Sequence, residues 1–519
     1  MNFSTIDLIV FASWILFMMG FGIWISRGKQ DTSQDYFLAS RSLPWWAVGG
    51  SLIASNISAE QFIGMSGSGY VVGIAIASYE LMAAATLLLV AKYFLPIFLE
   101  KGIYTMPQFL EQRYDPQVRT GLAVFWVLLF VFVNITSVLY LGGLALQTIM
   151  GIPLLPGVIG LALFASTFSI AGGLKAVVWT DVVQVIVLLL GGLLASVLVL
   201  EELGGSFWGG LSTLYERAPE KFDLILDRSN PEYINLPGIS VLIGGMWIAN
   251  LYYWGNNQYI IQRALAARSL REAQVGTAFA ALLKLVIPLI VVIPGIAAFV
   301  LQADIQKPDE AYPWVLSNYV TSGFKGLAFA ALIAAIGSSL SSMVNSASTI
   351  FTLDIYQPLV TRNGHPADEP SLVRIGKITA AVALLIGVLV APMLGNLDQA
   401  FQYIQEYTGF ISPGVVAIFL LGMFWKRTTA LAARWAVILA IPLSASFKIF
   451  FPDLPFLDRM GICFLLISAL MVVISWFGRP DPVDRSITLP QGAFRTDTRF
   501  HVLALLILGV LAVLYAVFW

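Results

Sequence analysis

Long apolar stretches alternate with short polar segments along almost the whole chain. A helix of about 20 apolar residues crosses the hydrocarbon core of a bilayer, so each long stretch predicts a transmembrane helix. Fourteen spans are expected, at residues 5–26, 45–70, 73–98, 117–149, 152–173, 178–203, 237–266, 274–302, 322–359, 370–394, 396–425, 427–451, 456–478 and 499–519. The pattern therefore predicts an all-α polytopic membrane protein.

Two of these spans are polar near their middle. The second span contains NISAEQ at 56–61, and the seventh contains NLYYWGNNQ at 250–258. A charge at that depth costs about 2.5–3.5 kcal/mol on insertion scales, so polar groups there are expected to face a cavity, a partner or a ligand. Nearby glycines make both helices easy to break. The freed backbone carbonyls are tolerated only inside protein or beside a hydrated site.

Spans two to six and seven to eleven form two blocks of five. Because five is odd, the second block enters the membrane in the opposite sense, as in the inverted repeats of secondary transporters. The interrupted helices are the first of each block, and such a pair points to a binding site. The expected division is an N-terminal helix and loop (1–44), a first repeat (45–203), an extracellular loop (204–236), a second repeat (237–425) and three C-terminal helices (426–519).

Lysine and arginine gather in alternate loops, which predicts that both termini lie outside the cell. The loops on the predicted cytoplasmic side carry Arg27, Lys29, Arg41, Lys101, Arg113, Arg119, Lys175, Arg263, Arg268, Arg271, Arg362, Arg374, Lys377, Lys426, Arg427, Arg479, Arg485 and Arg495. We expect a multi-pass protein of the inner (plasma) membrane.

Composition supports this class. Of 519 residues, 58% are hydrophobic and 11% charged, and the mean hydropathy of +0.83 is too high for a soluble fold. A net charge of -1 describes no basic face, so nucleic acid is not an expected partner. Cys463 is the one cysteine and has no intrachain disulfide partner.

A stripe of small and polar residues runs along span nine. With about 3.6 residues per turn, one face would carry Ala335, Ser338, Ser339, Ser341, Ser342 and Asn345. Two hydroxyls, with carbonyls freed near Ala54 and Ile57, could supply the oxygen ligands that hard cations prefer. A cage without a carboxylate suits sodium better than a transported proton. The alternative is close helix packing through small residues.

Asp181 stands near the predicted cytoplasmic end of span six. With Ser341 and Ser342 it could form a second cation site. The alternative is an acid placed at a helix N-terminus, where the helix dipole favours it.

Six polar residues lie on six different spans: Gln61, Glu80, Asn134, Asn250, Lys284 and Gln405. Amides both donate and accept hydrogen bonds, so the set could converge on a solute with many hydroxyls. Tyr253 and Trp254 add aromatic faces. Taken singly, each polar residue could instead make an interhelical hydrogen bond worth about 0.6–2 kcal/mol. An anionic solute would require an arginine, so a neutral polyol is favoured.

No catalytic triad, metal-ligand spacing or nucleotide-binding motif occurs in the sequence, so we expect no enzyme. The chain instead resembles the sodium:solute symporter family, and within it the bacterial sodium/galactose (sodium/glucose-type) branch. The resemblance runs from the first helix to the last span. It is carried by SAEQFIGMSGSG (58–69), GGLKAVVWTD (172–181), NLYYWG (250–255), SSLSS (338–342) and FQYIQEYT (401–408).

The resemblance implies a LeuT-like 5+5 inverted-repeat core with one extra N-terminal and three extra C-terminal helices. The implied sodium ligands are the carbonyls of Ala54, Ile57 and Ala335 and the hydroxyls of Ser338 and Ser339. The implied sugar contacts are Gln61, Glu80, Asn134, Asn250, Trp254, Lys284 and Gln405. The implied gates are Tyr253 held by Asn56 on the inner side, and Met65, Tyr79 and Phe401 on the outer side.

Two departures from the family pattern matter. Ala83 stands where the galactose branch has a sugar-binding serine, so one hydroxyl contact is missing. Ser341 stands where that branch has alanine, whereas relatives with a second sodium have a hydroxyl there. The joint presence of Asp181, Ser341 and Ser342 favours two sodium sites.

The sequence thus predicts a sodium-coupled secondary active symporter that imports a galactose- or glucose-like hexose by alternating access, with one or two Na⁺ per sugar. The expected partners are the sugar, sodium ions and the lipid bilayer, with no obligate protein partner. The alternatives are a sodium symporter for inositol, sialic acid, proline or another small solute, and a solute sensor or channel without coupled transport.

Overall fold

The computed structural model describes residues 4–27, 32–362, 368–394 and 400–519. Within these ranges every regular element is helical, apart from one isolated bridge between Leu43 and Ala267. The chain starts with α1 (Thr5–Ser26), α2 (Ser33–Leu38) and η1 (Ala39–Arg41). The Ser4 and Asp7 side chains cap α1, which places its first turn firmly.

The predicted first repeat holds the helices α3 to α10. Their bounds are α3 (Trp45–Asn56), η2 (Glu60–Met65), α4 (Ser66–Val72), η3 (Ile74–Ala77), α5 (Ser78–Leu89), η4 (Val90–Phe94), α6 (Leu95–Glu100), α7 (Met106–Arg113), α8 (Pro116–Leu129), η5 (Phe130–Ile135), α9 (Thr136–Met150) and α10 (Leu154–Gly204). The elements η2, η4 and η5 are π-helical turns.

The long helix α10 is bent at Gly173, between the expected spans 152–173 and 178–203. Gly173 has φ 54° and ψ -155°, a conformation that glycine adopts readily and other residues do not. A Cβ there would lie 2.4 Å from the carbonyl oxygen of Tyr36. Glycine is therefore required for both the backbone angle and the close approach of α2.

The outer segment and the predicted second repeat follow. Their bounds are α11 (Phe207–Arg217), η6 (Pro219–Lys221), η7 (Pro231–Ile234), α12 (Ser240–Ile243), α13 (Gly245–Leu251), η8 (Tyr252–Asn256), α14 (Gln258–Leu265), α15 (Leu270–Lys284), α16 (Ile287–Val300), η9 (Pro308–Glu310), α17 (Ala311–Tyr319), α18 (Phe324–Ile350), η10 (Phe351–Tyr356), α19 (Gln357–Arg362), α20 (Glu369–Val390), η11 (Ala391–Leu394), α21 (Ala400–Thr408) and α22 (Ser412–Phe424). The C-terminal helices are α23 (Ala430–Phe450), α24 (Phe456–Phe477) and α25 (Thr498–Val517).

Both predicted interruptions are confirmed. Ile57 follows α3 with an extended backbone (φ -74°, ψ 108°), and Asn257 follows the π-helical turn η8 in the same way (φ -85°, ψ 122°). Each break lies between two buried helical segments, so the freed backbone groups face protein and not lipid.

Ten helical stretches of the described residues are long and apolar enough to cross a membrane. The two broken spans divide into shorter helices, and 154–167 and 412–424 form shorter apolar helices, so the expected fourteen spans stay a prediction. In the most apolar 18-residue segment of 324–362, 94% of the residues are buried, whereas the corresponding share is 11% in α1 and 17% in α25. The helix α18 therefore lies at the centre of the bundle, and α1 and α25 lie at its surface.

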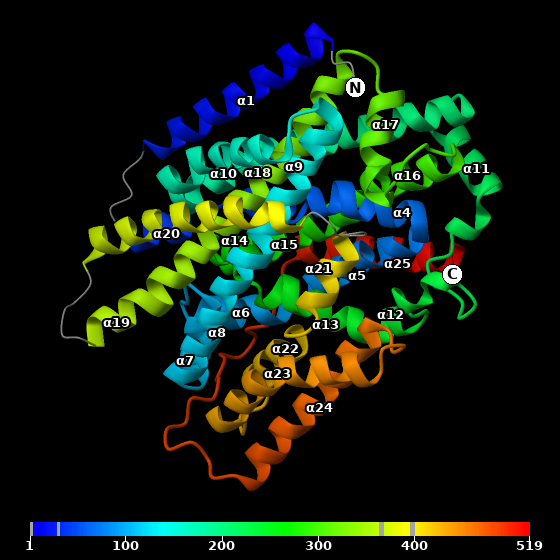
Figure 1. Ribbon diagram of the computed structural model, residues 1–519. Coiled ribbons are helices and arrows are strands. Elements are labelled where there is room, and N and C mark those ends of the chain that lie inside the picture. The colour runs from blue at the N-terminus through cyan, green and yellow to red at the C-terminus, as the bar shows by residue number, and fades with distance from the viewer. Residues whose placement is uncertain (1–3, 28–31, 363–367, 395–399) are drawn as a thin grey trace.

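Figure 1 shows α1 at one edge of the bundle and α22, α23 and α24 at the opposite edge. Between them, α18 packs against α10, α1, α20 and α3, and α3 packs against α15. The segments that surround both breaks therefore meet in the interior.

Candidate substrate and ion sites

The break after α3 brings main-chain oxygens to a serine of α18. The helical hydrogen-bond pattern stops at Asn56, so the last carbonyls of α3 need other partners. The Ser339 hydroxyl donates to the carbonyl oxygen of Ser55 at 2.9 Å and to that of Ile57 at 3.2 Å. All three residues are fully buried. This oxygen cluster is of the kind that a hard cation prefers.

The structure brings together part of the predicted sodium ligand set, which comprises Ala54, Ile57, Ala335, Ser338 and Ser339. Ile57 and Ser339 are in contact, and the two alanines are buried on the same two helices, α3 and α18. The Ser338 hydroxyl instead donates to Oδ1 of Asp181 at 2.6 Å. The Ser55 carbonyl joins the cluster without having been expected from the sequence.

Asp181 is the centre of a second polar cluster. Its fully buried carboxylate accepts hydrogen bonds from the hydroxyls of Ser51 at 2.6 Å, Ser55 at 3.2 Å and Ser338 at 2.6 Å. The guanidinium of Arg263 lies 3.6 Å away, measured from Nη2 to Oδ2. A buried carboxylate is stable only when it is paired and hydrogen-bonded, and this one is both.

The predicted second cation site of Asp181, Ser341 and Ser342 is assembled in part. The Ser342 hydroxyl lies 3.0 Å from that of Ser55, bonds to Arg263 and donates to the Ser338 carbonyl. The Ser341 hydroxyl donates only to the backbone, at 2.9 Å from the carbonyl of Ser338. Ser342 therefore belongs to the Asp181 cluster, and the part of Ser341 in it stays a prediction.

Arg263 corrects one sequence expectation. The sequence predicts a place in a cytoplasmic loop, because Arg263 follows the apolar part of span seven. It lies on α14 and is fully buried. The ion pair with Asp181 makes the burial of Arg263 energetically tolerable. The sequence around Arg263 shows only that an apolar span ends there, and it cannot reveal a partner on another helix.

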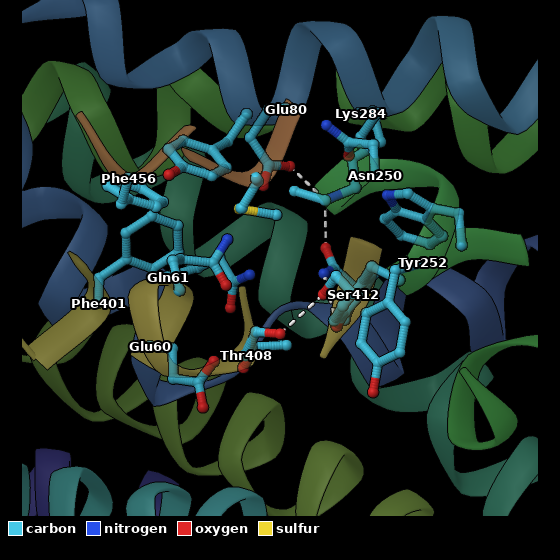
Figure 2. A pocket seen from close by; sticks show the side chains of 18 residues that line it. Glu60, Gln61, Glu80, Asn250, Tyr252, Lys284, Phe401, Thr408, Ser412 and Phe456 are labelled. Carbon is cyan, nitrogen blue, oxygen red and sulfur yellow. Dashed lines mark hydrogen bonds and ion pairs between the residues drawn. The ribbon is translucent and has the colours of Figure 1, made fainter. Parts of the chain in front are cut away.

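A cavity of about 50 Å³ lies beside the two breaks. Elements of both repeats line it (Figure 2). The lining residues are Asn56, Glu60, Gln61, Tyr79, Glu80, Ala83, Ala249, Asn250, Tyr252, Tyr253, Trp254, Lys284, Phe401, Gln405, Thr408, Ser412, Phe456 and Met460.

Six of the seven predicted sugar contacts line this cavity: Gln61, Glu80, Asn250, Trp254, Lys284 and Gln405. Asn134 is the exception. It is buried in η5, and its Oδ1 has no hydrogen-bond partner among the described residues. Its role in sugar binding stays a prediction. Ala83 also lines the cavity. The serine hydroxyl that the family pattern has at this position is therefore absent from the cavity wall.

A buried charge network crosses the cavity. The ammonium of Lys284 forms an ion pair with Glu80 and donates to Oδ1 of Asn56. It also lies 4.9 Å from the centre of the Trp254 ring, where a cation is attracted to the aromatic face. The other end of the Asn56 amide donates to the hydroxyl of Tyr253 at 2.9 Å. The predicted contact between Asn56 and Tyr253 is therefore present.

Of the three predicted outer gate residues, two line the cavity and one does not. Tyr79 and Phe401 both line the cavity and stack edge to face, with ring centres 5.2 Å apart. Met65 is fully buried at the end of η2 and is not among the lining residues. The neighbouring Gly64 packs so closely on Phe401 that a Cβ would lie 2.8 Å from the Phe401 Cβ. Their gating roles stay predictions.

Several lining residues were not expected as site residues. Glu60, one residue before Gln61, has a buried Oε1 without a hydrogen-bond partner among the described residues. Thr408 and Ser412 add polar groups from α21 and α22. The polarity of Glu60 in an apolar span was a usable signal. Phe456 and Met460 come from α24, where apolar residues in an apolar helix give no signal (Figure 2).

Comparison with known families decides the class. The model of the sodium:solute symporter family matches residues 36–440. The chain belongs to this family. It is 53% identical to the sodium/glucose cotransporter of Vibrio parahaemolyticus, over 99% of this chain and 98% of that protein. It is 34% identical to human sodium/myo-inositol cotransporter 2, over 83% of this chain and 68% of that protein.

Among solved structures, the chain matches a Na⁺-coupled sialic acid symporter in a substrate-bound outward-open state, described with a novel Na⁺ site. The TM-score is 0.81 at 25% identity, over 92% of this chain and 99% of that one. The predicted fold class is confirmed as all-helical and LeuT-like. This member of the sodium:solute symporter family is a multi-pass membrane protein and a transporter, not an enzyme.

Proposed function

We propose that the chain is a sodium-coupled symporter that imports a neutral hexose of the glucose or galactose type by alternating access. The observation that carries the proposal is the cavity beside the two broken helices, lined by amides and by the Lys284–Glu80 ion pair. The full-length similarity to a sodium/glucose cotransporter supports the same substrate class.

The lining favours a neutral solute. Among the described residues that line the cavity none is an arginine, and the single lysine is already paired with Glu80. Amide and carboxylate groups can together donate to and accept from sugar hydroxyls. Myo-inositol is the competing substrate, because it is also a neutral polyol and a relative is named for it.

Sodium is the driving ion in this proposal. Its ligands would be oxygens of Ala54, Ile57, Ala335, Ser338 and Ser339, which belong to α18 and to the segment around the first break. An ion held there ties the broken helix to α18 and favours one orientation of the two repeats. A second ion would use Asp181, Ser341 and Ser342.

The energetics make such coupling effective. At about -100 mV and a roughly tenfold sodium gradient, one ion supplies about 2.3 plus 1.4 kcal/mol. That is enough to accumulate a neutral solute by several hundred-fold, and a second ion would square the ratio.

We place the protein in the inner (plasma) membrane with both termini outside, and we retain the division into repeats at 45–203 and 237–425.

Uptake by purified protein in liposomes tests the proposal. Labelled glucose, galactose and myo-inositol are supplied with an inward sodium gradient, or with potassium in its place. Saturable hexose uptake that requires sodium is the expected result. Binding without uptake would indicate a sensor, and uptake without sodium coupling would indicate a channel or a uniporter. Either outcome contradicts the proposal.

A matched pair of variants tests the cavity. Asn250 lines it and donates to the carbonyl of Met246 at 3.1 Å. Asn318 donates to Trp314 at 2.9 Å in the same way but is exposed and outside the cavity. Asn250→Ala is expected to lower hexose uptake by up to about tenfold, since one neutral hydrogen bond to substrate is worth about 0.5–1.5 kcal/mol. Asn318→Ala should transport normally, and equal effects would contradict the assignment.

A further inference from the structure

The guanidinium of Arg263 lies inside the cluster that is expected to bind a second sodium ion. Its Nε donates to the hydroxyl of Ser51 at 3.1 Å, and its Nη2 lies 3.6 Å from Oδ2 of Asp181. The same guanidinium bonds to the hydroxyl of Ser342 and to the carbonyl of Tyr259. Arg263 thus has a polar partner on α3, α10 and α18 as well as on its own helix.

These contacts use the oxygens that a sodium ion at Asp181 would require. The Ser342 hydroxyl and the Asp181 carboxylate both face the guanidinium. The pair of Asp181 and Arg263 is close to neutral, and an added ion would leave one unpaired positive charge in a fully buried cluster. Such an unpaired charge is strongly unfavourable. Sodium and the guanidinium are therefore alternatives at one carboxylate.

We propose that Arg263 is a resident cation that competes with sodium at Asp181 and replaces the second ion when that ion leaves. The inference rests on the proposed sodium coupling and adds a residue that controls release. The competitor is on α14, which begins directly after the break at Asn257. Movement at that break would carry Arg263 toward Asp181 or away from it.

A chain of contacts joins this competitor to the sugar cavity. Arg263 bonds to the backbone of Tyr259, whose hydroxyl donates to that of Tyr253 at 2.5 Å. Tyr253 in turn accepts from Asn56, which also accepts from Lys284. A solute that displaces Lys284 or Tyr253 would thereby act on the segment that holds Arg263.

Sodium binding to the purified protein, measured with labelled sodium at equilibrium and without sugar, tests the proposal. Arg263→Gln keeps hydrogen-bond donors but removes the charge, so sodium affinity at the Asp181 site is expected to rise about tenfold. Arg263→Lys retains a competing cation, so its sodium affinity should rise less. The control is Arg113→Gln, because Arg113 is also buried but donates to the carbonyls of Gly422 and Trp425. It should leave sodium affinity unchanged.

Two further variants keep the test decisive. Adding Asp181→Asn to Arg263→Gln should abolish the gain, because the gain depends on that carboxylate. If Arg263→Gln does not fold, Ser51→Ala removes one hydroxyl that bonds both Arg263 and Asp181, and a smaller rise of about threefold is expected. Unchanged or weaker sodium binding in the folded variants overturns the proposal. Because sugar is absent, this result is separate from a failure of hexose uptake.

Discussion

At the scale of single residues, the ion pair between Lys284 and Glu80 is the most consequential contact in the cavity. Both side chains are almost completely buried, and Lys284 also bonds to Asn56. A buried pair is neutral as a unit, whereas either partner alone leaves an uncompensated charge in a low-dielectric site. The pair therefore stabilises the fold, and its part in sugar binding stays a prediction.

Neutralising one partner of the Lys284–Glu80 pair should lower the free energy of unfolding more than neutralising both. Lys284→Met or Glu80→Gln alone is expected to destabilise the protein by about 3–5 kcal/mol, and the double variant by less. Thermal unfolding in detergent measures the difference, and all three variants should lose hexose uptake. A double variant less stable than either single one, or normal uptake by Lys284→Met, would contradict this account.

The residues of the cavity differ in how visible they are in the sequence. Gln61, Glu80 and Lys284 stand out because polar groups are rare in apolar spans. Asn134 gives the same signal but does not line the cavity, since polarity identifies a buried group and not its direction. Arg263 was hidden by its place at the end of a span, where a cation normally belongs to a loop.

At the scale of elements, the two broken helices and α18 carry the residues of the proposed ion sites and part of the cavity lining. The breaks were predictable because glycine and polar residues interrupt an otherwise apolar pattern. The π-helical form of η2 and η8 was not, because it depends on tertiary packing around each break. The bend of α10 at Gly173 likewise depends on the contact with Tyr36.

Ser339 connects α18 to the first broken helix, so its loss should weaken the response to sodium. Ser339→Ala is expected to raise the sodium concentration for half-maximal uptake about tenfold, because one ligand oxygen and two bonds to freed carbonyls disappear. The control is Ser348→Ala on the same helix, whose hydroxyl donates to the carbonyl of Gly376 on α20 at 2.9 Å. A similar sodium dependence in both variants would exclude Ser339 as a ligand.

At the scale of the whole molecule, the number of ions moved per sugar decides how strongly the gradient is used. Two sodium sites predict that two charges move with each hexose. The voltage at which net sugar flux in liposomes reverses measures this number. A ratio of one would remove the Asp181 site from the transport cycle. It would leave the proposed first sodium site and the proposed sugar site unaffected.

The all-helical, LeuT-like fold was predictable, because long apolar stretches and two interrupted spans are typical of it. The division into two blocks of five spans stays a prediction. The contribution of the last helices to the cavity was not predictable. Phe456 and Met460 place α24, which lies outside both repeats, directly on the cavity wall. In the predicted inverted repeat each helix has a counterpart in the other repeat, whereas α24 lies outside both. Phe456 and Met460 belong to neither broken helix and to neither proposed ion site. We therefore expect that changes at these two positions can create new substrate preferences at little risk to energy coupling.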